Sequence, residues 1–577
     1  MRRHTPSACF RVGLRGIALT VTICGSMGCH LLDRRTEPDG PLAAYQKAVA
    51  APQDRVDTEG KDTANPLAIL GHPQPAPATS QQDGNEPNAF GPRAFHLTLD
   101  QAITKVLSNS PEIRIVSLDA SVAEQLIIKS EADLDPTAFG RLNYDQTDVP
   151  TTTFSEIGQS DVRTLESGIK RKITTGGEWS FSYALTRSWD DLAFRNPAKR
   201  YEPVLAFQLK QPLMRDSGRE VTLAGIDVAR LNHQIALLGF RQKAEDLATA
   251  VITLYWQLVQ AREDLQVQQQ LLDMATDTVG KVEGRREIDA TDVQIQQAQV
   301  NVRARQAQLL QAQRRVKDTQ DGLARLLADP QMDLLSDYQI VPDTPPSRIA
   351  NPLDTHQVLQ LALRDNPVMQ QVRLGTQIAD INLRVAKNQG MPRLDLVASA
   401  SSPALAPTVV EAHDRLLHSD YGSYAVGVVL EYPLGGNRQR EAELQKRRLE
   451  RKKAVATVQN LADQVAVQAR ERIRKVQTSF AEIQVQQQAV EAAKVQLQAI
   501  ADSEPIRDKL TPEFLLVKLQ AQESLSESLL AHARAIADYN IALAELVQTT
   551  GTLLTLHPID LPGQVPASGG DRDQDNR

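Results

Sequence analysis

The chain of 577 residues has few aromatic residues, and its cysteines are confined to one end. Phe, Tyr and Trp make up only 4% of the residues, although compact cores depend on these side chains for much of their buried area. The three cysteines are Cys9, Cys24 and Cys29, so no disulfide framework can exist in the body of the protein. These absences argue against a series of ordinary globular domains and favour an elongated, helix-rich chain.

The chain also lacks a strong charge of one sign and long apolar runs. A net charge of -7 excludes a nucleic-acid-binding protein that works through a bulk basic field. After the N-terminal segment no run of 18 apolar residues occurs, which excludes a multi-span helical membrane protein.

No constellation of catalytic residues stands out, and the sequence has neither a Gly-rich phosphate loop nor a nucleophile elbow. The ten histidines are scattered, and His413 and His418 fall in a predicted loop without other residues at metal-ligand spacing. We therefore predict a protein that is not an enzyme and that binds no cofactor or metal.

The N-terminal segment has the pattern of an export signal. Basic residues precede a short apolar run that ends near Gly28, which predicts a signal peptide at 1–28. The sequence 26–29 resembles a bacterial lipobox, so Cys29 is a candidate lipidation site; an ordinary signal peptide cut nearby is the alternative. Residues 29–94 and 557–577 are polar or rich in Pro and Gln, and they are predicted to be a disordered tether and a disordered tail.

Helix breakers are missing from two long stretches. No proline occurs from Leu213 to Asp329 or from Leu434 to Glu504. Two helices of about 70 residues are predicted there, each on the order of 100 Å long, with turns near 280–289 and 503–511. Helices of about 35 residues are predicted at 98–133 and 353–388. Apolar residues in the long helices follow heptad spacing, which predicts left-handed supercoiling; a plain coiled-coil spacer would show the same pattern.

The two halves of the chain resemble each other. An offset of 221 residues relates Pro212 to Pro433 and Asp292 to Glu513, with similar neighbours in each case. We predict tandem helix–strands–helix repeats at 95–330 and 353–556, joined by a linker at 331–352. The first repeat has about 35 extra residues, which we assign to an additional hairpin at about 148–203.

Aromatic residues gather where each repeat is expected to form strands. Ten of the aromatic residues lie between Phe139 and Phe207, and residues 179–185 alternate apolar with small polar side chains. This period suits a barrel with lipid outside and water inside, although a half-buried soluble sheet alternates identically. Residues 175–177 form a plausible hairpin turn, and 394–401 and 421–432 are the candidate strands of the second repeat. We interpret the extra hairpin as an extracellular loop, because strands added to one repeat would break the duplication.

At this point the chain resembles the TolC-like outer membrane efflux proteins over roughly residues 96–556. The resemblance rests on short motifs in a constant order: Leu97–Ala102 with Asn109–Pro111, Gln211–Leu213, Tyr255–Val259, Ala290–Gln294, Leu434–Arg438 and Tyr539–Asn540. It implies an α+β, mostly helical fold in a homotrimer, in which each chain gives four strands to one twelve-stranded outer-membrane β-barrel. A periplasmic coiled-coil barrel of α-helices continues it.

The resemblance also implies a function. Such proteins are passive exit ducts in the outer membrane that work with a periplasmic adaptor and an inner-membrane pump or secretion ATPase. By motif match, Thr291, Asp292 and Glu513 occupy periplasmic gate positions, and Lys509 stands where the family has a basic gate-linking residue. Two alternatives stay open: the acids could simply complement helix N-terminal dipoles, and the chain could be a lipid-tethered periplasmic scaffold or adaptor.

Overall fold

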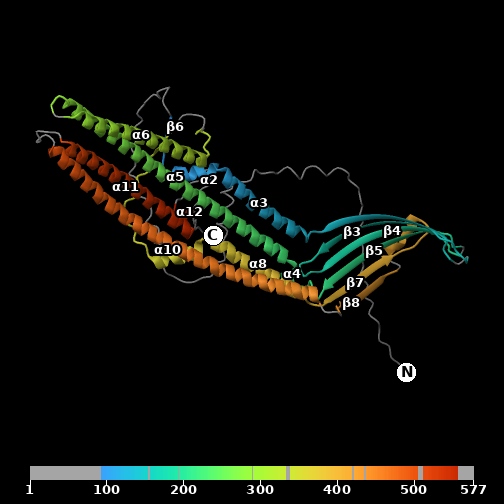
Figure 1. Cartoon of the computed structure of the whole chain (residues 1–577). Helices are drawn as coiled ribbons and strands as arrows, with labels where there is room; N and C mark the ends of the chain where they lie inside the picture. The colour runs from blue at the N-terminus through green and yellow to red at the C-terminus, as the bar shows by residue number, and fades with distance from the viewer. Residues whose placement is uncertain are drawn as a thin grey trace, which may run out of the picture.

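The computed structural model shows an elongated molecule with a helical part at one end and a single β-sheet at the other (Figure 1). The structure describes residues 93–556 except 154–155, 193, 289, 333–337, 419–420, 434–436 and 504–510. The predicted signal peptide, Cys29, residues 29–92 of the tether, the tail and Lys509 lie outside the described residues, whereas residues 93–94 of the predicted tether belong to a strand.

The two halves contain similar elements in the same order. The first half consists of β1 (Arg93–Leu97), α2 (Leu99–Asn109), α3 (Pro111–Ala132), β2 (Thr137–Asp148), β3 (Gln159–Lys172), β4 (Glu178–Asp190), β5 (Lys199–Pro212), α4 (Arg219–Thr222), α5 (Ala224–Gly284) and α6 (Asp292–Leu327). The second half consists of β6 (Tyr338–Pro342), α7 (Thr355–Asp365), α8 (Pro367–Gln389), β7 (Arg393–Pro403), α9 (Val409–His418), β8 (Ser423–Glu431), α10 (Arg438–Ser503), α11 (Pro512–Thr550) and α12 (Leu553–Leu556).

The helices predicted at 98–133 and 353–388 are each broken in two, so the prediction of one continuous helix is wrong. Ser110 has extended backbone angles and caps α3, which begins with Pro111. Asn366 caps α8 in the same way before Pro367. Proline lacks an N–H group and disfavours helical angles in the residue before it, so each proline ends one helix and starts the next.

The long helices form as predicted and make a wall four helices wide. α5 has 61 residues and α10 has 66, so they span about 90 and 100 Å at 1.5 Å per residue. Near the sheet the neighbours run in the order α3, α5, α8, α10, and toward the far tip the order is α6, α5, α11, α10. Buried Tyr255, Trp256 and Leu258 on α5 belong to the largest apolar core.

The predicted linker contributes a strand that the sequence reasoning missed. β6 pairs in parallel with β1, and Ile340 on β6 is fully buried. The hydroxyl of Tyr255 on α5 donates a hydrogen bond to the carbonyl of Leu97 and accepts one from the amide of Thr344. The start and the middle of the described chain are thereby tied to the same point of the helical wall.

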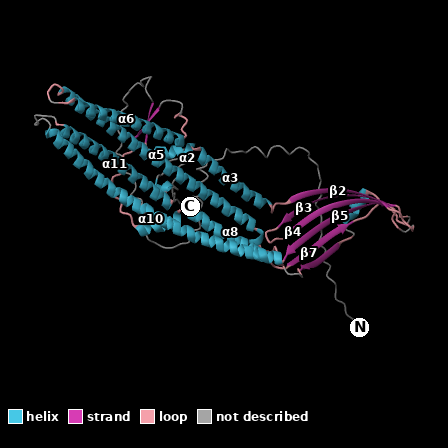
Figure 2. Cartoon of the chain, in the orientation of Figure 1, coloured by secondary structure: helices cyan, strands magenta, loops and turns pink. Residues whose placement is uncertain are grey.

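The six strands β2, β3, β4, β5, β7 and β8 form one antiparallel sheet in that order (Figure 2). The turn at 173–177 joins β3 and β4 as predicted, with Gly176 at a positive φ of 93°. Two expectations are wrong: the chain has six strands in the sheet and not four, and the extra hairpin is not a loop. β3 and β4 lie inside the sheet, fully paired with β2 and β5.

Candidate functional site

One face of the six-stranded sheet is apolar and exposed; we call it the apolar face. The pairing register places the exposed large apolar side chains on the same side. They are Leu142, Tyr144, Leu165, Ile169, Phe181, Trp189, Phe207, Tyr424, Val426, Val428 and Leu430. Because water penalises an exposed apolar surface of this extent, the face is suited to contact with lipid or another apolar partner.

Charged side chains on the apolar face lie toward the strand ends. These are Asp148, Asp161, Arg163, Arg171, Arg187 and Lys199. The guanidinium of Arg163 lies 5.0 Å from the ring centre of Tyr144. Charged and aromatic residues at the margins of an apolar band are typical of a membrane-spanning wall.

The opposite face, the polar face, carries charged, amide and hydroxyl side chains. Ion pairs cross its strands: an Arg141 nitrogen lies 3.3 Å from a Glu166 oxygen. An oxygen of buried Asp395 lies 2.8 Å from Arg393 and 3.4 Å from Lys210. The larger apolar exceptions on the described positions of this face are Phe139, Val162, Val204, Val397 and Val429. A sheet with one face of each kind can separate lipid from water.

The predicted loop around His413 is in fact a helix, α9, which lies on the apolar face and packs against β5. Ala412 and Leu416 are buried beneath it. The His413 ring approaches the carbonyl of Val409 through Nδ1, at 2.7 Å, so Nε2 is left to accept the Tyr183 hydroxyl at 2.6 Å. His413 therefore has a structural partner, and no group of three or more His, Cys, Asp or Glu suited to a metal occurs among the described residues.

The far tip of the helical part joins the two halves through a small apolar cluster. Val282 and Ile295 from the α5–α6 hairpin pack with Phe514, Leu515 and Leu519 from α11. Because Asp292 and Glu513 lie in the first turns of α6 and α11, this cluster holds both acids at the same end of the molecule.

Each predicted gate residue that the structure describes also has a local role. Thr291 caps α6 in a reciprocal capping box with Gln294. The carboxylate of Asp292 lies 3.2 Å from Arg286, and its side chain is 82% exposed. The sequence analysis did not identify Arg286 as a partner of Asp292. The two adjacent basic residues at 285–286, beside a predicted turn that carries an acid, could have indicated such a pair. A first-turn acid also complements the helix dipole, so the local contacts of one chain are compatible with both roles.

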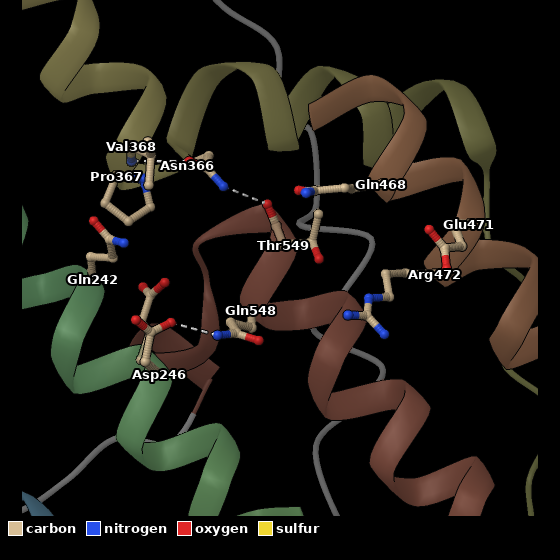
Figure 3. A pocket seen from close by; sticks show the side chains of 11 residues that line it. Gln242, Asp246, Asn366, Pro367, Val368, Gln468, Glu471, Arg472, Gln548 and Thr549 are labelled. Atoms are coloured by element: carbon tan, nitrogen blue, oxygen red, sulfur yellow. Dashed lines mark hydrogen bonds between the residues drawn. The ribbon is translucent and has the colours of Figure 1, made fainter. Parts of the chain in front are cut away.

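A polar cavity of about 280 Å³ opens where α5, α8, α10 and α11 meet (Figure 3). Asn366 donates to the carbonyl of Thr549 across it, and Gln548 donates to Asp246. Burial raises the pKa of Glu245 to about 7, even though Arg241 lies 3.1 Å away and opposes the shift. The cavity is thus a polar junction that ties the break between α7 and α8 to the end of α11.

No described helix is both long enough and apolar enough to cross a membrane. No protein-family model matches the sequence, and no curated protein is significantly similar to it.

Solved structures, in contrast, are similar over most of the chain. The outer-membrane channel OprN is 15% identical with a TM-score of 0.58, and the alignment covers 78% of this chain and 89% of OprN. CusC, described for its transmembrane channel formation, is 14% identical with a TM-score of 0.56, covering 78% and 91%. The outer membrane protein VceC of Vibrio cholerae is 16% identical with a TM-score of 0.55, covering 78% and 96%. At these identities the similarity establishes the fold, and the expected resemblance is confirmed at that level.

Proposed function

We propose that this chain, which has the fold of the TolC-like outer-membrane channels, is a passive exit duct from the periplasm to the cell exterior. In this proposal several copies form one channel, and the family's homotrimer is the assembly we adopt. A periplasmic adaptor and an inner-membrane pump or secretion ATPase would supply cargo and energy. The protein itself is not an enzyme.

The observation that carries the proposal is the sidedness of the sheet. A wall between lipid and a water-filled lumen needs apolar side chains on one face and polar side chains on the other, and alternation along each strand supplies both. The wall must also close, because unpaired backbone groups are costly in hydrocarbon. β2 and β8 are the edges of the sheet, so closure requires other copies of the chain.

The four-helix wall continues from the strands. α3, α5, α8 and α10 meet the sheet, and several copies side by side would extend the lumen into a periplasmic tunnel. The alternative of a periplasmic scaffold leaves the exposed apolar face without a purpose. Lipid attached to Cys29 would add an anchor at the same membrane.

The tip would then form the periplasmic gate. In a symmetric homotrimer, three copies of Asp292 and three of Glu513 would surround a narrow mouth and favour cations. Lys509 would offset the repulsion among these acids in the closed state. The pairing of Asp292 with Arg286 gives each copy a second compensating charge.

Single-channel conductance in a planar bilayer tests both parts of the proposal, the duct and its acidic gate. We expect small, cation-selective openings from the wild type, and larger or less selective openings from the Asp292→Ala/Glu513→Ala double variant. An unchanged pore in the double variant would remove the acidic gate but keep the duct. Folded, assembled protein without any conductance would contradict the duct.

A further inference from the structure

We infer that the β3–β4 hairpin is part of the membrane wall, and that three copies close an eighteen-stranded barrel. This inference rests on the proposed function. It concerns how many strands each copy contributes to the wall and which edges of the copies meet.

The first argument is that the hairpin has the same two faces as the rest of the sheet. On β4, Trp179, Phe181 and Leu185 point to the apolar face, whereas Ser180 and Ser182 point to the polar face. Leu165 and Ile169 of β3 continue the apolar face toward β2, and each is about half exposed. An extracellular loop has no reason to keep an exposed apolar face in line with its neighbours.

The second argument is a match of widths. Strands about 4.8 Å apart and tilted by about 40° each occupy about 6 Å of a barrel's circumference, so six strands cover about 38 Å. Four side-by-side helices at about 8–10 Å cover about 32–40 Å. The six-stranded sheet is therefore as wide as the wall of α3, α5, α8 and α10 that continues it. Four strands would cover only about 25 Å and would have to tilt much more to match.

The third argument concerns the edges. β2, at one edge, follows α3 at one side of the helical wall, and β8, at the other edge, precedes α10 at the other side. With an even number of strands, β8 of one copy is antiparallel to β2 of the next, so the sheet continues without a break. Every described residue of β8 and nearly all of β2 are exposed in the single chain. The strand that pairs with each edge of the sheet therefore belongs to a second copy of this chain.

Three copies would give a barrel about 36 Å across between opposite backbones, from three arcs of about 38 Å. This width agrees with the roughly 31–38 Å of a tunnel of twelve helices at the spacing above, so the duct would have no constriction where the sheet meets the helices.

A matched pair of neighbouring substitutions on β4 tests the hairpin. Phe181→Lys places a charge on the apolar face and Ser182→Lys places the same charge on the polar face. We expect Phe181→Lys to reduce the assembled protein recovered from outer membranes by about tenfold or more, because a cation facing lipid near mid-membrane is strongly disfavoured. Ser182→Lys should assemble at wild-type levels. Equal recovery of the two variants would overturn the placement of the hairpin in the wall.

Engineered cysteine pairs between β8 and β2 test the closure, since the described chain contains no cysteine of its own. Cross-linking between copies should give a covalent ladder that stops at three chains. A ladder that stops at two chains would indicate a twelve-stranded dimer and would overturn the number of strands in the barrel. Cross-links from β8 that form only with cysteines placed in β5, and not with those in β2, would overturn it as well.

A deletion separates this inference from the proposed function. Removing residues 159–190 leaves β2 antiparallel to β5 with their faces matched, because two strands are lost together. End-on electron microscopy should show a barrel as wide as the tunnel in the wild type and about one third narrower in the deletion variant. A wild-type barrel clearly narrower than its tunnel would contradict the inference while leaving the duct intact. Loss of conductance from an assembled barrel of the expected width would contradict the duct alone.

Discussion

The two halves of the molecule have the same series of helices but different strands and connections. Between its sheet-side helices the first half has four strands, and the second has two strands and the helix α9. The long helices of each half pack against their own neighbours, and α5 also packs against α8 and α11 of the second half, which restricts change. Strand connections at the far edge of the sheet meet fewer neighbours, so insertions are tolerated there. The halves thus differ most where the packing constrains them least.

The largest expected effect concerns the cores of the two halves. Trp256 in the first half is buried and lies edge-on to Tyr255, with ring centres 5.3 Å apart. Phe480 in the second half is half-buried against Tyr539. We expect Trp256→Ala to lower the free energy of unfolding by about 3–5 kcal/mol, and Phe480→Ala by clearly less. Chemical denaturation of the detergent-solubilised protein measures the free energy of unfolding of both variants. Equal losses would contradict a difference in packing between the cores of the two halves.

Two buried carboxyl groups of the first half are expected to make the stability depend on pH. The pKa of Glu245 is raised from 4.5 to about 7 and that of Asp264 from 3.8 to about 6, in both cases mainly by burial. Between the unfolded and folded pKa values the folded state holds more protons, so stability falls as pH rises from about 4 to 7. The equivalent positions at an offset of 221 residues, Ala466 and Val485, do not titrate.

The Glu245→Gln/Asp264→Asn variant should flatten this decline, and Glu245→Gln alone should remove part of it. The unfolding midpoint measured from pH 4 to 8 gives the comparison. A wild-type midpoint that rises over this interval would contradict the sign derived above.

A smaller effect is expected at the two helix starts of the tip. Thr291 forms a reciprocal capping box, whereas Thr511 caps α11 without one. Thr291→Ala should destabilise the start of α6 by about 0.5–2 kcal/mol, and Thr511→Ala should have a smaller effect on α11. Hydrogen exchange of the amides in the first turn of each helix measures the loss.

The smallest effect is expected at the contact between α9 of the second half and β4 of the first half. Tyr183→Phe removes the hydrogen bond to His413 and should loosen α9 by about 1 kcal/mol without altering the sheet. Proteolysis within 404–418 should become a few times faster, while Tyr201→Phe, whose side-chain hydroxyl makes no described contact with α9, serves as a control. Unchanged proteolysis would show that apolar packing alone holds α9.

Local sequence signals predicted much of the fold. The absence of breakers and the apolar repeat indicated α5 and α10, the period of two indicated β4, and the glycines at 176–177 indicated the turn after β3. The period of two also indicated which side chains of the strand lie on the same face of the sheet. Asp292 and Glu513 lie in first helical turns, as the sequence indicates, because first-turn acids are local features, whereas the capping role of Thr291 is a finding of the structure.

What the sequence could not decide depends on distant partners. Alternation makes β3 and β4 strands, but only their pairing with β2 and β5 makes them part of the sheet and not a projecting loop. α9 was missed because ten residues are too short for a clear period, and burial against β5 stabilises it. β6 depends on pairing with β1, which lies about 245 residues away. The sequence by itself determined the elements and their faces, since these follow from short-range periodicity. The tertiary structure alone decided the width of the sheet, since that is set by which strands find each other.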